Sequence, residues 1–251
     1  MERQGLPVFM QDPKTYEILK EVAEAIPKGC QVYLVGGAAR NAVYYRLFHK
    51  KMPQRDYDIL AIGNYKRFIQ ALRKRKFAYG LIKRKKVLVL KKKVVSKPRK
   101  SRFEDYVFLD IKFSKDSARK NLEEGVNFTI NGFAIPLKAL TSEKWYKQTL
   151  RLPTAVQDLK ARQIQINQSF HASDLYSCLR FMSLGFKPPP KKETILMLKN
   201  LKRIDKRRFQ RNIKKLFRYV GGEKRAKQLS RKLGIKENIC DLKAIKNLII
   251  S

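Results

Sequence analysis

The segment from residue 32 to residue 60 constrains the fold more than any other part of the chain. An apolar run, Val32 to Val35, is typical of a strand and ends at Gly36 and Gly37. A stretch of small residues that contains Arg40 follows and opens a predicted helix. Glycines let the backbone approach an anion closely, and the N–H groups at a helix start favour negative charge. This strand, turn and helix therefore predict a phosphate-binding turn.

Two aspartates, Asp56 and Asp58, lie at the head of the next apolar run, Ile59 to Ile62. Side chains two residues apart in a strand share a face, so the two carboxylates point the same way. Paired hard oxygen ligands beside a triphosphate suit Mg²⁺. Taken alone, each signal is weak, because a Gly-Gly turn often follows a strand and an Asp-x-Asp pair usually lies in a solvated loop.

A third carboxylate, Asp110, stands inside the apolar run from Tyr106 to Phe113, which predicts another strand. A carboxylate in such surroundings is costly unless it is paired or holds a metal. On a sheet beside the Asp-x-Asp strand, Asp110 would complete a three-carboxylate metal site. The alternative interpretation is an acid on an edge strand that faces water.

The charge of the chain predicts a polyanionic partner. Among 251 residues, 58 are basic and 21 acidic, which gives a net charge of +37, and self-repulsion of that size is tolerable mainly when nucleic acid is bound. No acidic residue occurs from Ile59 to Phe103, where two strand-like pieces predict a basic hairpin. The alternative for these charges is a solvated face. We expect RNA contacts at Arg73, Lys74, Arg75, Lys83, Arg84, Lys85, Lys86, Arg207, Arg208 and Arg211.

The composition also sets the class of protein. A hydrophobic content of 43% argues against disorder, and the sequence has no long apolar span, so we expect no membrane insertion. Three scattered cysteines predict reduced thiols in an intracellular, cytoplasmic protein. Apolar residues three or four apart predict helices over 191 to 251, with Asp205 as an N-cap and Gly221 as a stop.

The motifs together resemble the head domain of the class II nucleotidyltransferases, the tRNA CCA-adding enzymes and bacterial poly(A) polymerases. Those proteins carry a Leu-Val-Gly-Gly-x-x-Arg turn, here residues 34 to 40, before an Asp-x-Asp strand. Their Phe-Thr-x-Asn segment is similar to residues 128 to 131, and their neck helix is similar to residues 171 to 186. The chain departs from the family at Gly125 to Asn127, where the family has Arg-Arg-Asp, and at Ser177, where it has arginine.

The resemblance implies an α+β fold. A nucleotidyltransferase head domain with a polymerase beta-like mixed sheet would comprise residues 1 to 165, and an all-helical neck and RNA-binding domain would comprise 166 to 251. The family's body and tail domains have no counterpart, so a protein or ribonucleoprotein partner could replace them. Asp158 is expected to be a structural cap. The family's site implies nucleotide binding by Gly36, Gly37, Arg40, Lys115, Asn127, Asn131, Asp174 and Arg180.

The implied activity is template-independent addition of nucleotides from ATP or CTP to an RNA 3′ end, in tRNA processing or poly(A) synthesis. Asp56, Asp58 and Asp110 would hold two Mg²⁺ ions. A second hypothesis is a retired homologue that acts as a basic RNA-binding or ribonucleoprotein component, and the departures from the family motifs favour it. A third is transfer of a nucleotide to a protein or small molecule, which the basic surface does not require.

Overall fold

The computed structural model describes residues 5–54, 56–83, 86–92, 106–167 and 171–247, and for residues 79–92 it describes the backbone alone. The chain forms two compact units. The first comprises Met1–Glu123 and Asn131–Pro153, and the second comprises Glu124–Ile130 and Thr154–Ser251.

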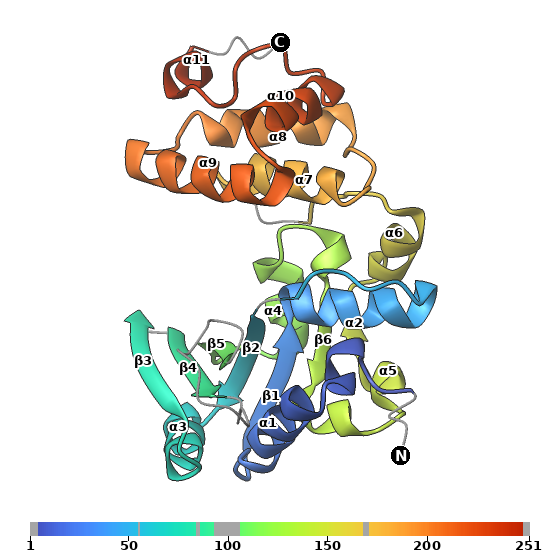
Figure 1. The fold of residues 1–251 in the computed structure, drawn as a ribbon, viewed down its shortest axis with the longest axis vertical. Coiled ribbons are helices and arrows are strands. Elements are labelled where there is room, and N and C mark those ends of the chain that lie inside the picture. Colours follow the sequence, from blue (N-terminus) through green and yellow to red (C-terminus); the bar gives the residue numbers. More distant parts are fainter. Residues whose placement is uncertain (1–4, 55, 84–85, 93–105, 168–170, 248–251) are drawn as a thin grey trace, which may run out of the picture. The chain divides into compact units, whose positions relative to one another are not determined.

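The first unit is built on a mixed sheet of the order β3-β4-β5-β2-β1-β6-β7 in the described part of the chain (Figure 1). β2 and β5 are parallel, whereas the other neighbouring strands are antiparallel. The predicted α+β fold with a mixed sheet is confirmed. The strands are β1 Cys30–Val35, β2 Tyr57–Gly63, β3 Ala78–Lys83, β4 Lys86–Lys92, β5 Tyr106–Ser114, β6 Phe133–Pro136 and β7 Leu150–Arg151.

The strand β5 lies inside the sheet, between β4 and β2. Its burial alternates along the strand, because Leu109 and Ile111 are fully buried while the residues between and beside them are half-buried or exposed. Asp110 lies on the less buried face. The alternative interpretation, an acid on an edge strand, is therefore wrong.

The helix α1 begins where the sequence supplies a capping group. Asp12 accepts a hydrogen bond from the backbone N–H of Thr15 at 3.0 Å, and Pro13 occupies the first helical position of α1. Trp145 is fully buried and its indole N–H donates to the carbonyl of Gly5 at 2.8 Å. The helices before Pro153 are α1 Pro13–Glu24, α2 Gly36–Phe48, α3 Tyr65–Lys74, α4 Ala118–Gly125 and α5 Trp145–Gln148, with 3-10 helices η1 Val8–Gln11, η3 Thr129–Asn131 and η4 Leu137–Thr141.

The second unit is helical, as predicted, and α7 packs against α8, α9 and α10 (Figure 1). Asp205 caps α9 by accepting from the N–H of Arg208 at 2.8 Å, and Gly221 ends it with φ of 89°. Asp158 is not the expected cap, because it lies within α6 and Thr154 precedes that helix. The helices are α6 Ala155–Ala161, α7 Asp174–Ser183, α8 Lys191–Leu201, α9 Lys206–Val220, α10 Glu223–Lys232 and α11 Leu242–Lys246.

The compact units divide at a different place from the predicted boundary at residue 165. Residues 154 to 165 and 124 to 130 both belong to the second unit. Backbone hydrogen bonds explain this assignment, since the N–H of Thr129 donates to Gln165 at 3.0 Å and the N–H of Asn167 donates to Asn127 at 2.9 Å. The segment that precedes β6 is thus tied to residues far along the chain.

The predicted basic hairpin is present as the antiparallel pair β3 and β4. Of its four expected RNA-binding residues, Arg84 and Lys85 lie outside the described residues, and only the backbone is described at Lys83 and Lys86. None of the described helices is long and apolar enough to cross a membrane.

A matched pair of substitutions on β2 tests the position of the core. Ile59 is fully buried, whereas Ile62 on the same strand is half-buried. We expect Ile59→Ala to lower the free energy of unfolding by about 2–5 kcal/mol because it leaves a cavity in the core. Ile62→Ala should cost clearly less. Urea denaturation measures both, and equal losses would contradict this burial of β2.

Candidate active site

Two carboxylates meet at the centre of the sheet. Asp58 on β2 is paired in register with Asp110 on the parallel neighbour β5. Side chains at paired positions of adjacent strands lie on the same face, so the two carboxylates are neighbours. Both residues are half-buried. Like charges this close repel each other in a partly dry setting, and a bound cation would relieve that cost.

The glycine turn closes over this pair. Val35, the last residue of β1, is paired with Asp58, and Gly36 follows with φ of 63°. A Cβ atom added at Gly36 would come within 2.8 Å of the Asp58 Oδ2 atom. The missing side chain therefore lets the Asp58 carboxylate approach the turn closely, and the turn leads into the N-terminus of α2.

The third predicted carboxylate is less closely held. Asp56 is exposed and precedes β2, two residues before Asp58. Its spacing places it toward the same face as Asp58. Among the described residues, no group of three His, Cys, Asp or Glu side chains is placed to hold a metal ion. Asp58 and Asp110 thus fit a divalent cation by their paired oxygen donors, while the three-ligand site stays a prediction.

Arg40, predicted to bind phosphate, is buried in α2 with an exposed fraction of 3%. Its Nη1 donates to Asn131 Oδ1 at 2.7 Å, and its Nε and Nη2 donate to Asn41 Oδ1 at 3.2 and 2.9 Å. Two of the predicted nucleotide-binding residues, Arg40 and Asn131, are therefore brought together. In this arrangement the guanidinium joins α2 to the end of η3, rather than facing solvent.

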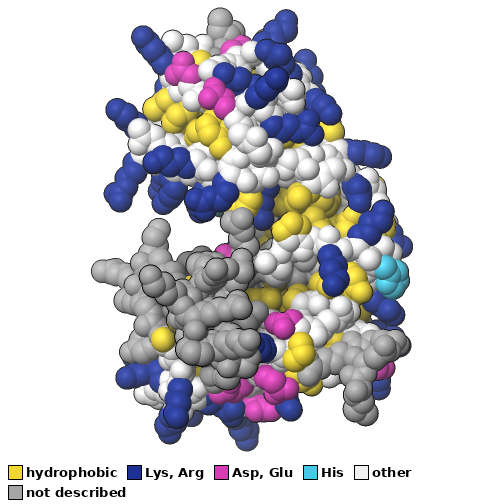
Figure 2. Space-filling model, in the orientation of Figure 1, with side chains coloured by type: hydrophobic (Ala, Val, Ile, Leu, Met, Phe, Trp, Pro, Cys, Tyr) yellow, Lys and Arg dark blue, Asp and Glu magenta, His cyan; other side chains and the backbone are white. Residues whose placement is uncertain are grey.

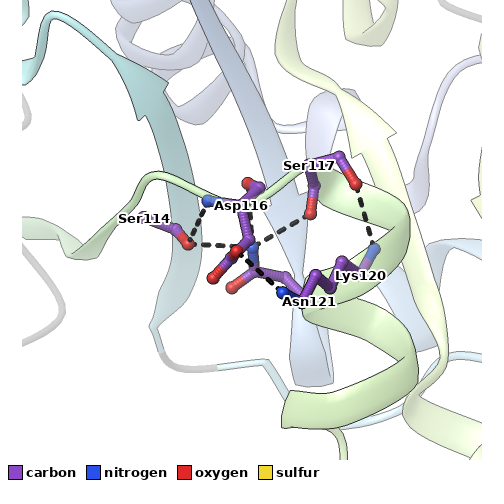
Figure 3. A network of polar contacts seen from close by, with 5 residues as sticks. All are labelled: Ser114, Asp116, Ser117, Lys120 and Asn121. Carbon is purple, nitrogen blue, oxygen red and sulfur yellow. Dashed lines mark hydrogen bonds and ion pairs between the residues drawn. The ribbon is translucent and has the colours of Figure 1, made fainter.

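Lys115 is exposed in the loop that follows β5. Figure 3 shows the hydrogen bonds that hold this loop. Asn121 donates to the Ser114 hydroxyl at 3.0 Å and to the backbone carbonyls of Asp116 and Ser117, and Lys120 forms an ion pair with Asp116 at 3.2 Å. The loop therefore has a defined path, and it carries the ammonium group of Lys115 five residues beyond Asp110.

In the second unit, the predicted nucleotide-binding residues Asn127 and Asp174 contact each other. The Asn127 amide donates to Asp174 Oδ1, and the N–H of His171 donates to Oδ2 at 2.5 Å. Asp174 is only 1% exposed, and this burial raises the pKa of its carboxyl, although the hydrogen bonds from His171 and Asn127 oppose the shift. Its carboxylate oxygens thus serve contacts inside the unit.

Arg180, which the resemblance predicts to bind the nucleotide, lies on α7 together with Asp174. Six residues separate them on α7, and only side chains three or four apart are neighbours on a helix. The Arg180 guanidinium instead lies over the ring of Tyr219 from α9, 4.0 Å from the ring centroid. This contact could not be predicted from sequence spacing, because it depends on how α7 packs against α9.

The basic residues outside the hairpin that were predicted to bind RNA lie at the surfaces or ends of helices. Arg73 and Lys74 are exposed in the last turn of α3, while Arg75 forms an ion pair with Glu24 at 3.3 Å. Lys and Arg side chains cover much of the second unit in the view of Figure 2. The solvent side of α9 is the densest helical example in the described chain, with exposed Lys206, Arg207, Arg208, Arg211, Lys214, Lys215 and Arg218.

Sequence reasoning missed two residues of the site, Asn41 and Gln54. The Asn41 amide donates to the carbonyl of Pro53 at 3.0 Å and to Gln54 Oε1 at 2.9 Å, and the Gln54 amide donates to the carbonyl of Asp56. Asn41 is 2% exposed. A polar amide in an otherwise small and apolar helix start was the available signal, since such a group is buried only with partners.

The close approach of Asp58 to Gly36 predicts that alanine substitutions at the two neighbouring glycines differ in their effect on stability. Gly36→Ala forces a side chain into the left-handed region and against Asp58, so we expect the free energy of unfolding to fall by about 1–3 kcal/mol. A Cβ at Gly37 meets only Arg40 Nη2 at 3.7 Å, an ordinary contact. Gly37→Ala should therefore change stability by less than about 1 kcal/mol. Urea denaturation of both variants decides, and equal effects would contradict this turn geometry.

Comparison with known proteins relates the fold to enzymes that process tRNA. The Thermotoga maritima CCA-adding enzyme in complex with tRNA matches 88% of this chain with a TM-score of 0.63 and 18% identity. A tRNA-processing enzyme matches 89% with a TM-score of 0.63 and 21% identity, and a CCA-adding enzyme with CTP matches 88% with a TM-score of 0.61 and 19% identity.

These matches cover only 51%, 57% and 51% of the three compared chains, in that order, so this chain spans little more than half of their length. No protein-family model matches the sequence, and no curated protein matches it either. The two units therefore share the fold of the corresponding part of CCA-adding and tRNA-processing enzymes.

Proposed function

We propose that this protein is an RNA nucleotidyltransferase that adds nucleotides from ATP or CTP to an RNA 3′ end without a template. The observation that carries the proposal is the pair Asp58 and Asp110, in register on parallel strands with the backbone of Gly36 close to the Asp58 carboxylate. Solved structures of similar fold include CCA-adding enzymes with CTP and with ATP. An activity that transfers a nucleotide from a nucleoside triphosphate to a hydroxyl group fits both facts.

The two aspartates supply hard oxygen ligands for Mg²⁺, with Asp56 as the third ligand at the start of the same strand. When bound there, Mg²⁺ would lower the pKa of the attacking 3′-hydroxyl and neutralise charge on the triphosphate. Because β2 and β5 are interior strands, the carboxylates Asp58 and Asp110 are held by the sheet and lose little freedom on binding.

The glycine turn offers backbone N–H groups of Gly36 and Gly37 at the start of α2 to the phosphates. Buried Arg40 adds positive charge close by, since its Nη2 lies 3.7 Å from the position of a Cβ at Gly37. Lys115 adds an exposed ammonium group on the loop after β5. These groups would stabilise negative charge on the phosphates as the bond to the leaving group breaks.

RNA is the proposed acceptor and partner. The net charge of +37 and the exposed basic side of α9 support contact with a phosphate backbone. A CCA-adding enzyme of similar fold has been solved in complex with tRNA. Because the chain spans little more than half of such enzymes, a partner protein could supply further RNA contacts.

A second candidate function is RNA binding without catalysis. Two observations favour it: no group of three metal-ligating side chains is assembled in the described residues, and Asp174 is buried against Asn127 instead of facing a base. The cost of placing Asp58 beside Asp110 without a cation weighs against it. Nucleotide addition therefore remains the first candidate.

The carboxylates provide the decisive test of activity. Labelled RNA is incubated with Mg²⁺ and each nucleoside triphosphate separately, and the wild type should extend the RNA while Asp58→Asn or Asp110→Asn lowers the rate at least about 100-fold. Glu237→Gln is the control, because Glu237 is an exposed acid in the second unit and does not belong to the sheet or to the loop of Lys115. Tight RNA binding by all proteins with no extension by any would leave the RNA-binding function.

The basic side of α9 predicts a change in the salt dependence of RNA binding. Arg207, Arg211 and Lys214 are exposed, and replacing all three by Gln should reduce the slope of log K against log salt by roughly 2 for single-stranded RNA. The control replaces the exposed residues Lys14, Lys20 and Lys28 by Gln, an equal charge change near acidic Glu17 and Glu24. Equal slopes for the two variants would place the RNA elsewhere.

A further inference from the structure

A continuous chain of hydrogen bonds runs from the glycine-turn helix to the residue before β2. It starts at the buried guanidinium of Arg40, which donates to Asn41 Oδ1 at 2.9 and 3.2 Å. Asn41 Nδ2 donates to the Pro53 carbonyl at 3.0 Å and to Gln54 Oε1 at 2.9 Å. Gln54 Nε2 then donates to the backbone carbonyl of Asp56.

The direction of donation along these hydrogen bonds is fixed at both ends. Arginine can only donate, so the oxygen of the Asn41 amide must face Arg40 and its nitrogen must face away. Backbone carbonyls of Pro53 and Asp56 can only accept, so the Gln54 amide must present its nitrogen to Asp56 and its oxygen to Asn41. One orientation of both amides satisfies every group. Reversing either amide would make a donor face a donor or an acceptor face an acceptor.

The hydrogen bonds run from buried residues to exposed ones, so the buried end can hold the exposed end in place. Arg40 and Asn41 are 3% and 2% exposed and belong to α2, whose first residue is Gly36. Gln54 is half-buried, and Asp56 is exposed and precedes β2. The contacts of Gln54 thus connect an exposed carboxylate residue to the rigid element that carries the glycine turn.

We propose that Asn41 and Gln54 are positioning residues, which hold the backbone at Asp56, and thereby the point from which its carboxylate extends, relative to the glycine turn and the Asp58–Asp110 pair. The proposal rests on the proposed function for its catalytic meaning, because a fixed Asp56 matters only if a cation and a triphosphate bind there. The Gln54 link adds to the hold that Asp56 has through its place directly before β2. The effect should fall on the reaction rate, since small misplacements of a catalytic group slow the chemical step strongly.

Gln54→Glu tests the last link by itself. Glutamate has the same shape and can still accept from Asn41, but when ionised it cannot donate to the Asp56 carbonyl. The control is Gln70→Glu, the same charge change at an exposed position of α3. Asn41→Asp is a second variant, because it keeps the acceptor for buried Arg40 and removes the donor toward Pro53 and Gln54.

Two measurements are made on the full chain. Hydrogen exchange should become faster at the backbone amides around Asp56 in Gln54→Glu and in Asn41→Asp, with the melting temperature of Gln54→Glu unchanged. In the extension assay, kcat should fall about 10-fold to 100-fold while KM for the nucleotide stays within about 2-fold. Gln70→Glu should match the wild type in both.

The outcomes separate this proposal from the proposed function. Unchanged exchange around Asp56 would overturn the hydrogen-bond chain as the holder of that residue. Faster exchange with unchanged kcat would overturn its positioning role and leave a structural one. A wild type that never extends RNA would overturn the proposed function, and with it the catalytic role of Asn41 and Gln54, whatever the exchange shows.

Discussion

The parallel pairing of β2 with β5 is the interaction on which the candidate site depends. It sets Asp58 beside Asp110 in an otherwise antiparallel sheet, and a shift by one residue would turn one of the two carboxylates to the opposite face. A parallel neighbour needs a crossover connection, and here the chain passes through α3 and the hairpin β3–β4 before it returns as β5. The position of the carboxylates is thus secured by a long-range pairing.

Buried polar groups tie the turn to its surroundings. Arg40 is buried and its donors go to the amide oxygens of Asn41 and Asn131, which come from α2 and from the segment before β6. Buried charge is costly without such partners, so these amides are structurally required as well as close to the site. The same logic applies in the second unit, where buried Asp174 accepts from Asn127 and His171.

The positive charge of α9 lies on its surface, unlike the buried charges of Arg40 and Asp174. Residues 206 to 220 contain no acid, and their basic side chains lie on the solvent side of α9, while Phe209, Ile213, Leu216 and Val220 face the core. Acids in the first unit offset some of the positive charge, as Glu24 does at Arg75. The basic side of α9 is therefore the densest exposed basic surface on the described helices.

The sequence by itself determined the elements that carry the candidate site. Short-range rules were enough for the Gly36–Gly37 turn, the strand that begins after Asp56, the apolar alternation around Asp110, and the caps Asp205 and Gly221. Only the tertiary structure decided which polar groups meet. Arg40 joins Asn131, Asp174 joins Asn127 and not Arg180, and Asn41 reaches Gln54, because each contact links residues that sequence spacing leaves unrelated. Burial then forces each polar group to take the nearest partner that packing supplies.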